Sequence, residues 1–144
     1  MARFLAALSL SFWLAFAAGA PALAEPVPAG EAQAAHAVVS AQLDAFAADD
    51  AKRAFSYAAP AIRGMFGTPE RFMAMVRAGY PVVYRPASVT FLIPLRSDGQ
   101  LFQGVHLTDR DGTLWLATYR LERQPDGAWR IAACDVQAAS GKMI

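Results

Sequence analysis

The sequence predicts an α+β fold, with N-terminal helices packed on a curved antiparallel sheet. Between Glu31 and Ala78 the apolar residues recur at helical spacing, whereas after Pro81 apolar and polar residues alternate with the period of two that is typical of strands. Three turns that each contain Asp-Gly separate four strand-like runs of about ten residues. A helical half followed by a half of hairpins is typical of an α+β domain.

The first 24 residues have the features of a secretory signal peptide. Arg3 gives a positive start, an apolar run of 15 residues covers 4–18, and Ala22-Leu23-Ala24 has the small-x-small pattern that signal peptidase accepts. We predict cleavage after Ala24. An uncleaved membrane anchor is the alternative, but the run is shorter than the roughly 20 residues that cross a bilayer. The sequence therefore predicts an exported protein, periplasmic or secreted, without stable membrane insertion after cleavage.

Removing residues 1–24 from a chain of 144 leaves 120 residues, the size of one domain. We predict a proline-rich flexible leader at 25–30, a single domain at 31–138 and a C-terminal tail at 139–144. The signal peptide holds one of the 13 basic residues, so 12 basic and 12 acidic residues remain. This balance argues against a nucleic-acid partner, which would require a basic surface. The single cysteine, Cys134, excludes an intrachain disulfide.

The first part of the helical half is predicted to contain two helices and a helical turn. The first helix covers about 31–48. The second starts at Asp50, which is a good N-cap, and ends before Pro60 because the residue before a proline disfavours helical geometry. A helical turn then continues up to Gly67.

The third helix is the most clearly delimited element. Thr68 is a good N-cap, Pro69 suits the first helical position, and Gly79 is predicted to end the helix in a left-handed conformation. The stripe predicted to pack against the sheet comprises Phe72, Met75, Val76 and Gly79. Met73 is predicted to point away from this stripe, and the segment Tyr80–Tyr84 to form the rim of any opening.

Four strands are predicted to form an antiparallel meander. They cover residues 87–96, 101–109, 113–123 and 128–137. Pro94 interrupts the first strand, which places it at a sheet edge or a bulge. Alternation assigns one face of each strand to the inside of the sheet. The predicted inward residues are Val89, Phe91, Ile93 and Leu95; Leu101, Gln103, Val105, Leu107 and Asp109; Trp115, Ala117, Tyr119 and Leu121; and Trp129, Ile131, Ala133 and, without a bulge, Asp135.

A set of packing and turn residues spread over about 36–136 resembles a known family. The set comprises Gln42, Ala45, Phe46, Ala54, Phe55, Ala58, Ala59, Pro60, Ile62, Phe66, Phe72, Met75, Val76, Gly79, Tyr80, Pro81, Ala117, Tyr119, Leu121, Asp126, Gly127, Trp129, Arg130, Ile131 and Cys134. Through these residues the sequence resembles the bacterial family named domain of unknown function 4864, within the nuclear-transport-factor-2-like superfamily. The resemblance implies a cone whose sheet wraps around helices and often encloses a pocket. It implies no particular activity, because that superfamily includes isomerases, dehydratases, hydrolases and binding modules.

The residues most often used in catalysis are poorly placed. His106 would be the default general base near neutral pH, but it falls on the outward phase of its strand and is predicted to be structural or at the surface. His36 lies beside alanines on the first helix and is predicted to be a bystander. No third ligand accompanies them at ligand spacing, so neither a metal site nor a cofactor is predicted. Cys134 is flanked by alanine and aspartate, which do not stabilise a thiolate, so it is predicted to be a buried small apolar residue.

The residues predicted to line a pocket are Met75, Tyr84, Gln103, Tyr119 and Asp135. The first hypothesis is a non-catalytic binding or interaction module, homodimeric through its sheet, with a small apolar ligand in its pocket. The alternative is a small cofactor-free isomerase, dehydratase or hydrolase, in which Asp135 moves protons and Tyr119 stabilises an oxyanion. That enzyme requires both side chains in one enclosed pocket. A purely structural domain without a cavity is the third alternative.

Overall fold

The structure, a computed structural model, describes residues 25–139. The predicted signal peptide and most of the predicted tail lie outside the described residues. The helices are α1 (Ala29–Ala47), α2 (Ala51–Ser56), α3 (Pro60–Phe66), α4 (Pro69–Gly79) and α5 (Pro81–Tyr84). The strands are β1 (Glu25–Pro26), β2 (Ser88–Phe91), β3 (Leu95–Ser97), β4 (Gln100–Thr108), β5 (Leu114–Arg123) and β6 (Trp129–Ala138).

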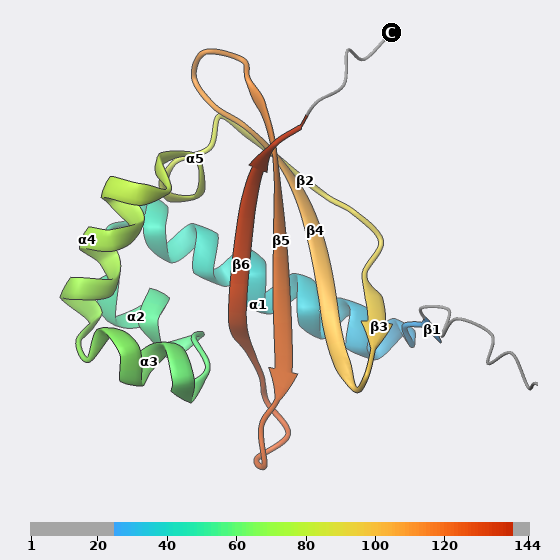
Figure 1. Cartoon of the computed structure of the whole chain (residues 1–144). Coiled ribbons are helices and arrows are strands. Elements are labelled where there is room, and N and C mark those ends of the chain that lie inside the picture. The colour runs from blue at the N-terminus through green and yellow to red at the C-terminus, as the bar shows by residue number, and fades with distance from the viewer. Residues whose placement is uncertain (1–24, 140–144) are drawn as a thin grey trace, which may run out of the picture.

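The six strands form one antiparallel sheet with the order β1-β3-β4-β5-β6, and β2 pairs with β4 as well. Helix α1 crosses one face of this sheet, and α2, α3, α4 and α5 gather beside β6 (Figure 1). The helices and the sheet thus form separate layers. This arrangement confirms the predicted α+β fold.

Local signals determine where the helices begin and end. The side chains of Asp50 and Thr68 accept hydrogen bonds from the backbone N–H groups three residues on, which confirms both predicted N-caps. The predicted left-handed cap at Gly79 is wrong: Gly79 is the last residue of α4, and Tyr80 leaves the helix with φ −135°. The reason is Pro81, which disfavours helical geometry at Tyr80 and then starts α5.

Residues 25–30 belong to the fold rather than forming the flexible leader that the sequence predicted. Strand β1 pairs with β3, with Glu25 opposite Arg96. Arg96 also forms an ion pair with Glu31 in the first turn of α1. Pro94 splits the predicted first strand into β2 and β3, and β1 covers the edge of β3 that this break leaves free.

The inward faces predicted for β4 and β5 are largely confirmed. Leu101, Gln103, Val105, Leu107, Ala117, Tyr119 and Leu121 are all buried. Val89 and Phe91 of β2 lie opposite the inward Leu107 and Val105, so their predicted facing is right, although Val89 is 41% exposed. The prediction is wrong for Leu95, which lies opposite Phe102 and is 51% exposed, and for Ile93, which is 87% exposed. These short strands lie at the side of the sheet away from α2 to α5, so few helices cover them (Figure 1). Asp109 directly follows β4, and its carboxylate accepts hydrogen bonds from the backbone N–H groups of Asp111 and Thr113 in the turn instead of entering the core.

A β-bulge reverses the predicted facing of the second half of β6. The register between β5 and β6 shifts so that Leu121 lies opposite Ile131 but Arg120 lies opposite Ala133. Ala132 is the extra residue, and an extra residue moves every later side chain to the other face. Cys134 therefore lies opposite the buried Tyr119 and faces inward.

Asp135 consequently faces outward. It lies opposite Thr118 on the outer face of the sheet and is exposed. The prediction of an inward Asp135 is wrong because it assumed a strand without a bulge.

Candidate functional site

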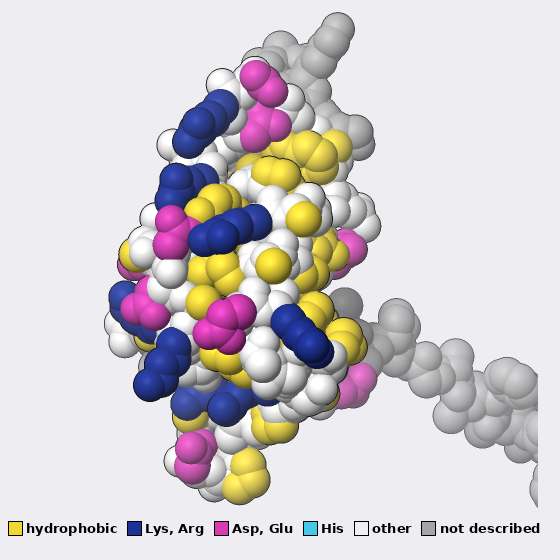
Figure 2. Space-filling view, turned by 90° about the vertical axis from the view of Figure 1, so that its left-hand side faces the viewer, with side chains coloured by type: hydrophobic (Ala, Val, Ile, Leu, Met, Phe, Trp, Pro, Cys, Tyr) yellow, Lys and Arg dark blue, Asp and Glu magenta, His cyan; other side chains and the backbone are white. Residues whose placement is uncertain are grey.

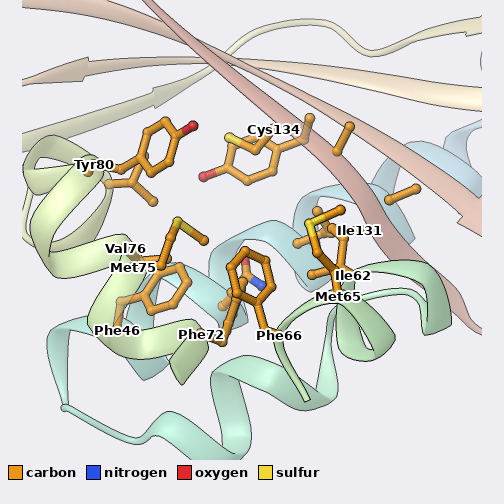
Figure 3. Close-up of a pocket in the computed structure, with 16 residues that line it drawn as sticks. Phe46, Ile62, Met65, Phe66, Phe72, Met75, Val76, Tyr80, Ile131 and Cys134 are labelled. Atoms are coloured by element: carbon orange, nitrogen blue, oxygen red, sulfur yellow. The ribbon is translucent and has the colours of Figure 1, made fainter. Parts of the chain in front are cut away.

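A pocket of about 460 Å³ opens between helices α3 and α4 and strand β6 (Figure 3). It is lined by Gln42 and Phe46 of α1; Ile62, Met65 and Phe66 of α3; Phe72, Met75, Val76 and Gly79 of α4; Tyr80 and Val83; Tyr119 of β5; and Ile131, Ala132, Ala133 and Cys134 of β6. Figure 2 looks onto this side of the molecule, where hydrophobic side chains gather among charged ones. The site is therefore an apolar hollow in the helical side of the domain.

The pocket has a packed aromatic wall and an exposed apolar mouth. The ring of Phe72 lies 5.8 Å from that of Phe46 and 5.6 Å from that of Phe66, in tilted pairs that aromatic rings favour. At the mouth, Met65 is 75% exposed and Tyr80 is 38% exposed. Exposed apolar side chains beside a hollow are typical of a binding surface.

Several residues that line the hollow are small. On β6 they are Ala132, Ala133 and Cys134, next to the larger Ile131, and on α4 the last residue is Gly79. A Cβ atom added at Gly79 would meet no heavy atom within 4 Å. A larger side chain at Gly79 would extend into this open space.

The polar groups of the pocket are few and neutral, and none of its lining residues is charged. Gln42 is buried and donates through Nε2 to the carbonyl of Ala54 at 3.2 Å, which joins α1 to α2. Tyr119 is 1% exposed, and its buried hydroxyl has no nitrogen or oxygen partner among the described residues. The thiol of Cys134 lies beside this hydroxyl, but a thiol is a weak hydrogen-bonding group.

Burial keeps Tyr119 and Cys134 in their neutral forms. Desolvation raises the pKa of the Tyr119 hydroxyl well above its ordinary value of 10.0, with a smaller contribution from Cys134. Desolvation likewise raises the pKa of the Cys134 thiol to about 12, only partly offset by the Tyr119 hydroxyl. Cys134 is therefore protonated at neutral pH and is not an activated nucleophile, as the sequence predicted.

Residues 29–144 match the family described as a domain of unknown function (DUF4864). The chain belongs to the DUF4864 family. This membership confirms the part of the resemblance that named the domain-of-unknown-function 4864 family. No curated protein and no solved structure matches the chain.

Of the five residues predicted to line a pocket in this DUF4864 domain, the structure brings two together. Met75 and Tyr119 both line the pocket. Gln103 is buried elsewhere, where its Nε2 donates to the carbonyls of Leu92 at 2.7 Å and Gly104 at 2.9 Å and so supports the break between β2 and β3. Asp135 lies on the outer face and accepts a hydrogen bond from Gln137.

The fifth predicted residue, Tyr84, belongs to a charged cluster outside the pocket. Its hydroxyl donates to the carboxylate of Asp49. The same carboxylate accepts hydrogen bonds from the guanidinium groups of Arg77 and Arg85, each with an N···O distance of 2.8 Å. These hydrogen bonds, that of Tyr84 first and that of Arg77 second, lower the pKa of Asp49. The cluster ties the end of α1 to α4 and α5. The rim predicted at Tyr80–Tyr84 is thus formed by Tyr80 and not by Tyr84.

The positions of these side chains do not support the alternative hypothesis of a cofactor-free enzyme that uses Asp135 and Tyr119. That hypothesis needed Asp135 and Tyr119 in one enclosed pocket, whereas the bulge places them on opposite faces of the sheet. The pocket contains neither a carboxylate nor a histidine. His106 is on the outer face opposite Leu116, as predicted, and His36 is exposed, with its ring 3.9 Å from that of Phe91.

Within residues 25–139, no cluster of three or more His, Cys, Asp or Glu side chains is arranged to hold a metal ion. In the same part of the chain, no helix combines the length and the apolar character that crossing a membrane requires.

Several pocket residues were missed from the sequence. Ile62, Met65 and Phe66 have the i, i+3, i+4 spacing of one helix face, a signal that could have predicted the α3 wall.

Met73 was predicted to point away from the packed stripe, yet it is 3% exposed and lies in the core. The prediction was wrong because the helix is covered over a wider arc than one stripe: α2 and α5 also contact α4.

Proposed function

We propose that this protein is an exported, non-catalytic binding module whose pocket takes a small, neutral, mainly apolar ligand. The observation that carries the proposal is the pocket beside β6, with its aromatic wall and uncharged lining. Its volume of about 460 Å³ lies within the usual range of ligand sites. Export is supported by the signal-peptide pattern of residues 1–24.

The chemistry of the lining restricts the ligand. A charged group would lose its hydration without finding a counter-charge, which is costly in an apolar site. A neutral hydrogen-bonding group could pair with the Tyr119 hydroxyl, whose unpaired burial costs roughly 1–3 kcal/mol. We therefore propose a ligand with an apolar body and one neutral polar group.

The fold is proposed to be a bacterial variant of the nuclear-transport-factor-2-like cone. Helices on one side of a curved antiparallel sheet, with a pocket between the helices and the sheet, support this assignment. In such an arrangement the walls are rigid elements, and rigid walls suit a binding site because little ordering entropy is lost on binding.

A titration with N-phenyl-1-naphthylamine, a neutral apolar fluorophore, tests the proposal. We expect saturable binding at one site per chain. Gly79→Phe places a ring beside the pocket and should weaken binding by at least about tenfold, or about 1.4 kcal/mol. Gly79→Ala adds only a methyl group in open space and should retain binding.

Gly64→Phe is the matched control, because Gly64 is an exposed helical glycine that does not line the pocket and has no heavy atom within 4 Å of an added Cβ. Its affinity should equal that of the wild type. Absence of saturable binding, or equal affinity in Gly79→Phe and Gly64→Phe, would refute the pocket as the binding site.

A further inference from the structure

Strand β6 has a free edge next to the pocket. In an antiparallel ladder, alternate residues direct both backbone groups to the same neighbouring strand. The N–H of Leu92 donates to the carbonyl of Gly104, so even-numbered residues of β4 face β2 and the odd-numbered ones face β5. It follows that Ala117 and Tyr119 of β5 face β4, since they lie opposite Val105 and Gln103.

The backbone groups of Cys134 and Val136 therefore point away from the sheet. These residues lie opposite Tyr119 and Ala117, whose own backbone groups are engaged with β4. The hydrogen bond from the N–H of Ala139 to the carbonyl of Leu114 agrees with this assignment, because it shows that the odd-numbered residues at this end of β6 direct their backbone groups to β5. Within residues 25–139, no backbone partner reaches the outward groups of Cys134 or Val136.

The same edge of β6 is already paired at Ile131, before the bulge. An extended segment can therefore pair with this edge. The N–H of Ile131 donates to the carbonyl of Tyr57, and the N–H of Ala59 donates to the carbonyl of Ile131, each at 2.8 Å. Ala58 and Ile131 form a parallel bridge. The edge thus becomes free at the bulge, within the part of β6 that lines the pocket (Figure 3).

We propose that the occupant of the site is an extended peptide segment that pairs with β6 at Cys134 and Val136 and inserts one large side chain into the pocket. Directly opposite residues of paired strands point to the same face. A peptide residue opposite Cys134 would therefore point, like Cys134, toward the pocket. This inference rests on the proposed function, because it names the class of ligand that the pocket takes.

The chemistry of the edge and the pocket identifies the peptide. Exposed edges are usually protected by lysine, proline or inward-pointing charge, whereas from Cys134 to Ala138 the only charge is Asp135, which points to the outer face. Backbone pairing supplies affinity, and the adjacent pocket supplies side-chain specificity. Tryptophan or tyrosine fits best, because each brings an apolar ring and one neutral hydrogen-bonding group toward Tyr119.

A second copy of the chain fits less well. If β6 paired with β6 of another molecule, the side chains brought to the pocket face would be cysteine and valine from the same strand. These are too small to fill about 460 Å³. The pocket therefore favours a different segment with a larger side chain.

The test begins with selection from a displayed library of random heptapeptides against the purified protein, with Gly79→Phe as the counter-selection. The best peptide is then added to ¹⁵N-labelled protein, and amide hydrogen exchange is followed by NMR. Without peptide, the amides of Cys134 and Val136 should exchange quickly, whereas those of Asp135 and Gln137, which face β5, should be protected. With peptide, the first two should slow by at least about tenfold. Methylating the peptide nitrogens that face β6 should weaken binding by about fivefold or more.

The possible outcomes separate this inference from the proposed function. If N-phenyl-1-naphthylamine binds but no heptapeptide is enriched, or the enriched peptide leaves both amides unprotected, the peptide inference fails and the pocket proposal stands. If neither the fluorophore nor any peptide binds, both fail. If the free protein is a dimer in which the amides of Cys134 and Val136 are already protected, a second copy occupies the edge and the inference is overturned.

Discussion

Replacing Phe46 by alanine is expected to lower the free energy of unfolding by about 3–5 kcal/mol, the usual cost of removing a buried phenylalanine. Phe46 is 1% exposed and packs against Phe72, so it joins α1 to α4 below the pocket. The space left behind would lie next to an existing hollow, because Phe46 lines the pocket. Urea denaturation followed by tryptophan fluorescence measures the change.

Met65→Ala provides the control for this prediction. Met65 lines the same pocket, but it is 75% exposed, so its truncation should change the free energy of unfolding by less than about 0.5 kcal/mol. A cost below about 1 kcal/mol for Phe46→Ala would mean that the aromatic wall is not packed as described.

The protein is expected to lose stability steeply as the pH rises above 9. Burial raises the pKa of Cys134 from 9.0 to about 12, so the unfolded thiol ionises about three pH units before the folded one. The stabilising contribution is complete below pH 9 and is lost as the pH rises toward 12. Three units correspond to an upper limit of about 4 kcal/mol, and partial exposure of the Cys134 side chain reduces the loss below this limit. The raised pKa of Tyr119 acts in the same direction.

Urea denaturation of the wild type and of Cys134→Ala at pH 7, 9 and 10.5 isolates the thiol. Groups that behave alike in the two proteins cancel, so the difference between them reports on the Cys134 thiol. We expect the wild type to lose more stability than Cys134→Ala between pH 9 and 10.5. Parallel losses in the two proteins would show that the thiol is accessible to water in the folded state.

The parts of the fold that could be predicted from the sequence depend on local signals. Asp50 and Thr68 cap helices through hydrogen bonds to residues three positions away, so their role is visible in a short segment. The Asp-Gly turns define the hairpins in the same way, with positive φ at Gly99, Gly112 and Gly127. These signals were enough to predict the α+β class.

The errors arise where one residue or one distant contact changes the outcome. The bulge at Ala132 is a single extra residue in an otherwise regular alternation, and it transfers Asp135 to the outer face. Tyr84 is held by Asp49, 35 positions earlier in the chain. Neither effect has a periodic signature, so the sequence could not show that Asp135 is separated from Tyr119 or that Tyr84 lies outside the pocket.

The pocket itself was only partly predictable. Met75 and Tyr119 were found because helical spacing and strand phase placed them on inward faces. The gap between α4 and β6 depends on how those elements are spaced in three dimensions, which the pattern of apolar residues does not specify. Figure 3 shows that the pocket wall also includes Ile62, Met65 and Phe66 of α3, a segment that the sequence indicated only as a helical turn.

The most direct test of the binding pocket is NMR of protein labelled with ¹³C at the methionine methyl groups, titrated with N-phenyl-1-naphthylamine. Met65 and Met75 line the pocket, whereas Met73 is buried in the same helical layer but does not line it. We expect saturable shifts of the Met65 and Met75 signals, with Met73 much less affected. Unchanged Met65 and Met75 signals at saturating probe, or equal shifts of all three, would contradict the proposed pocket.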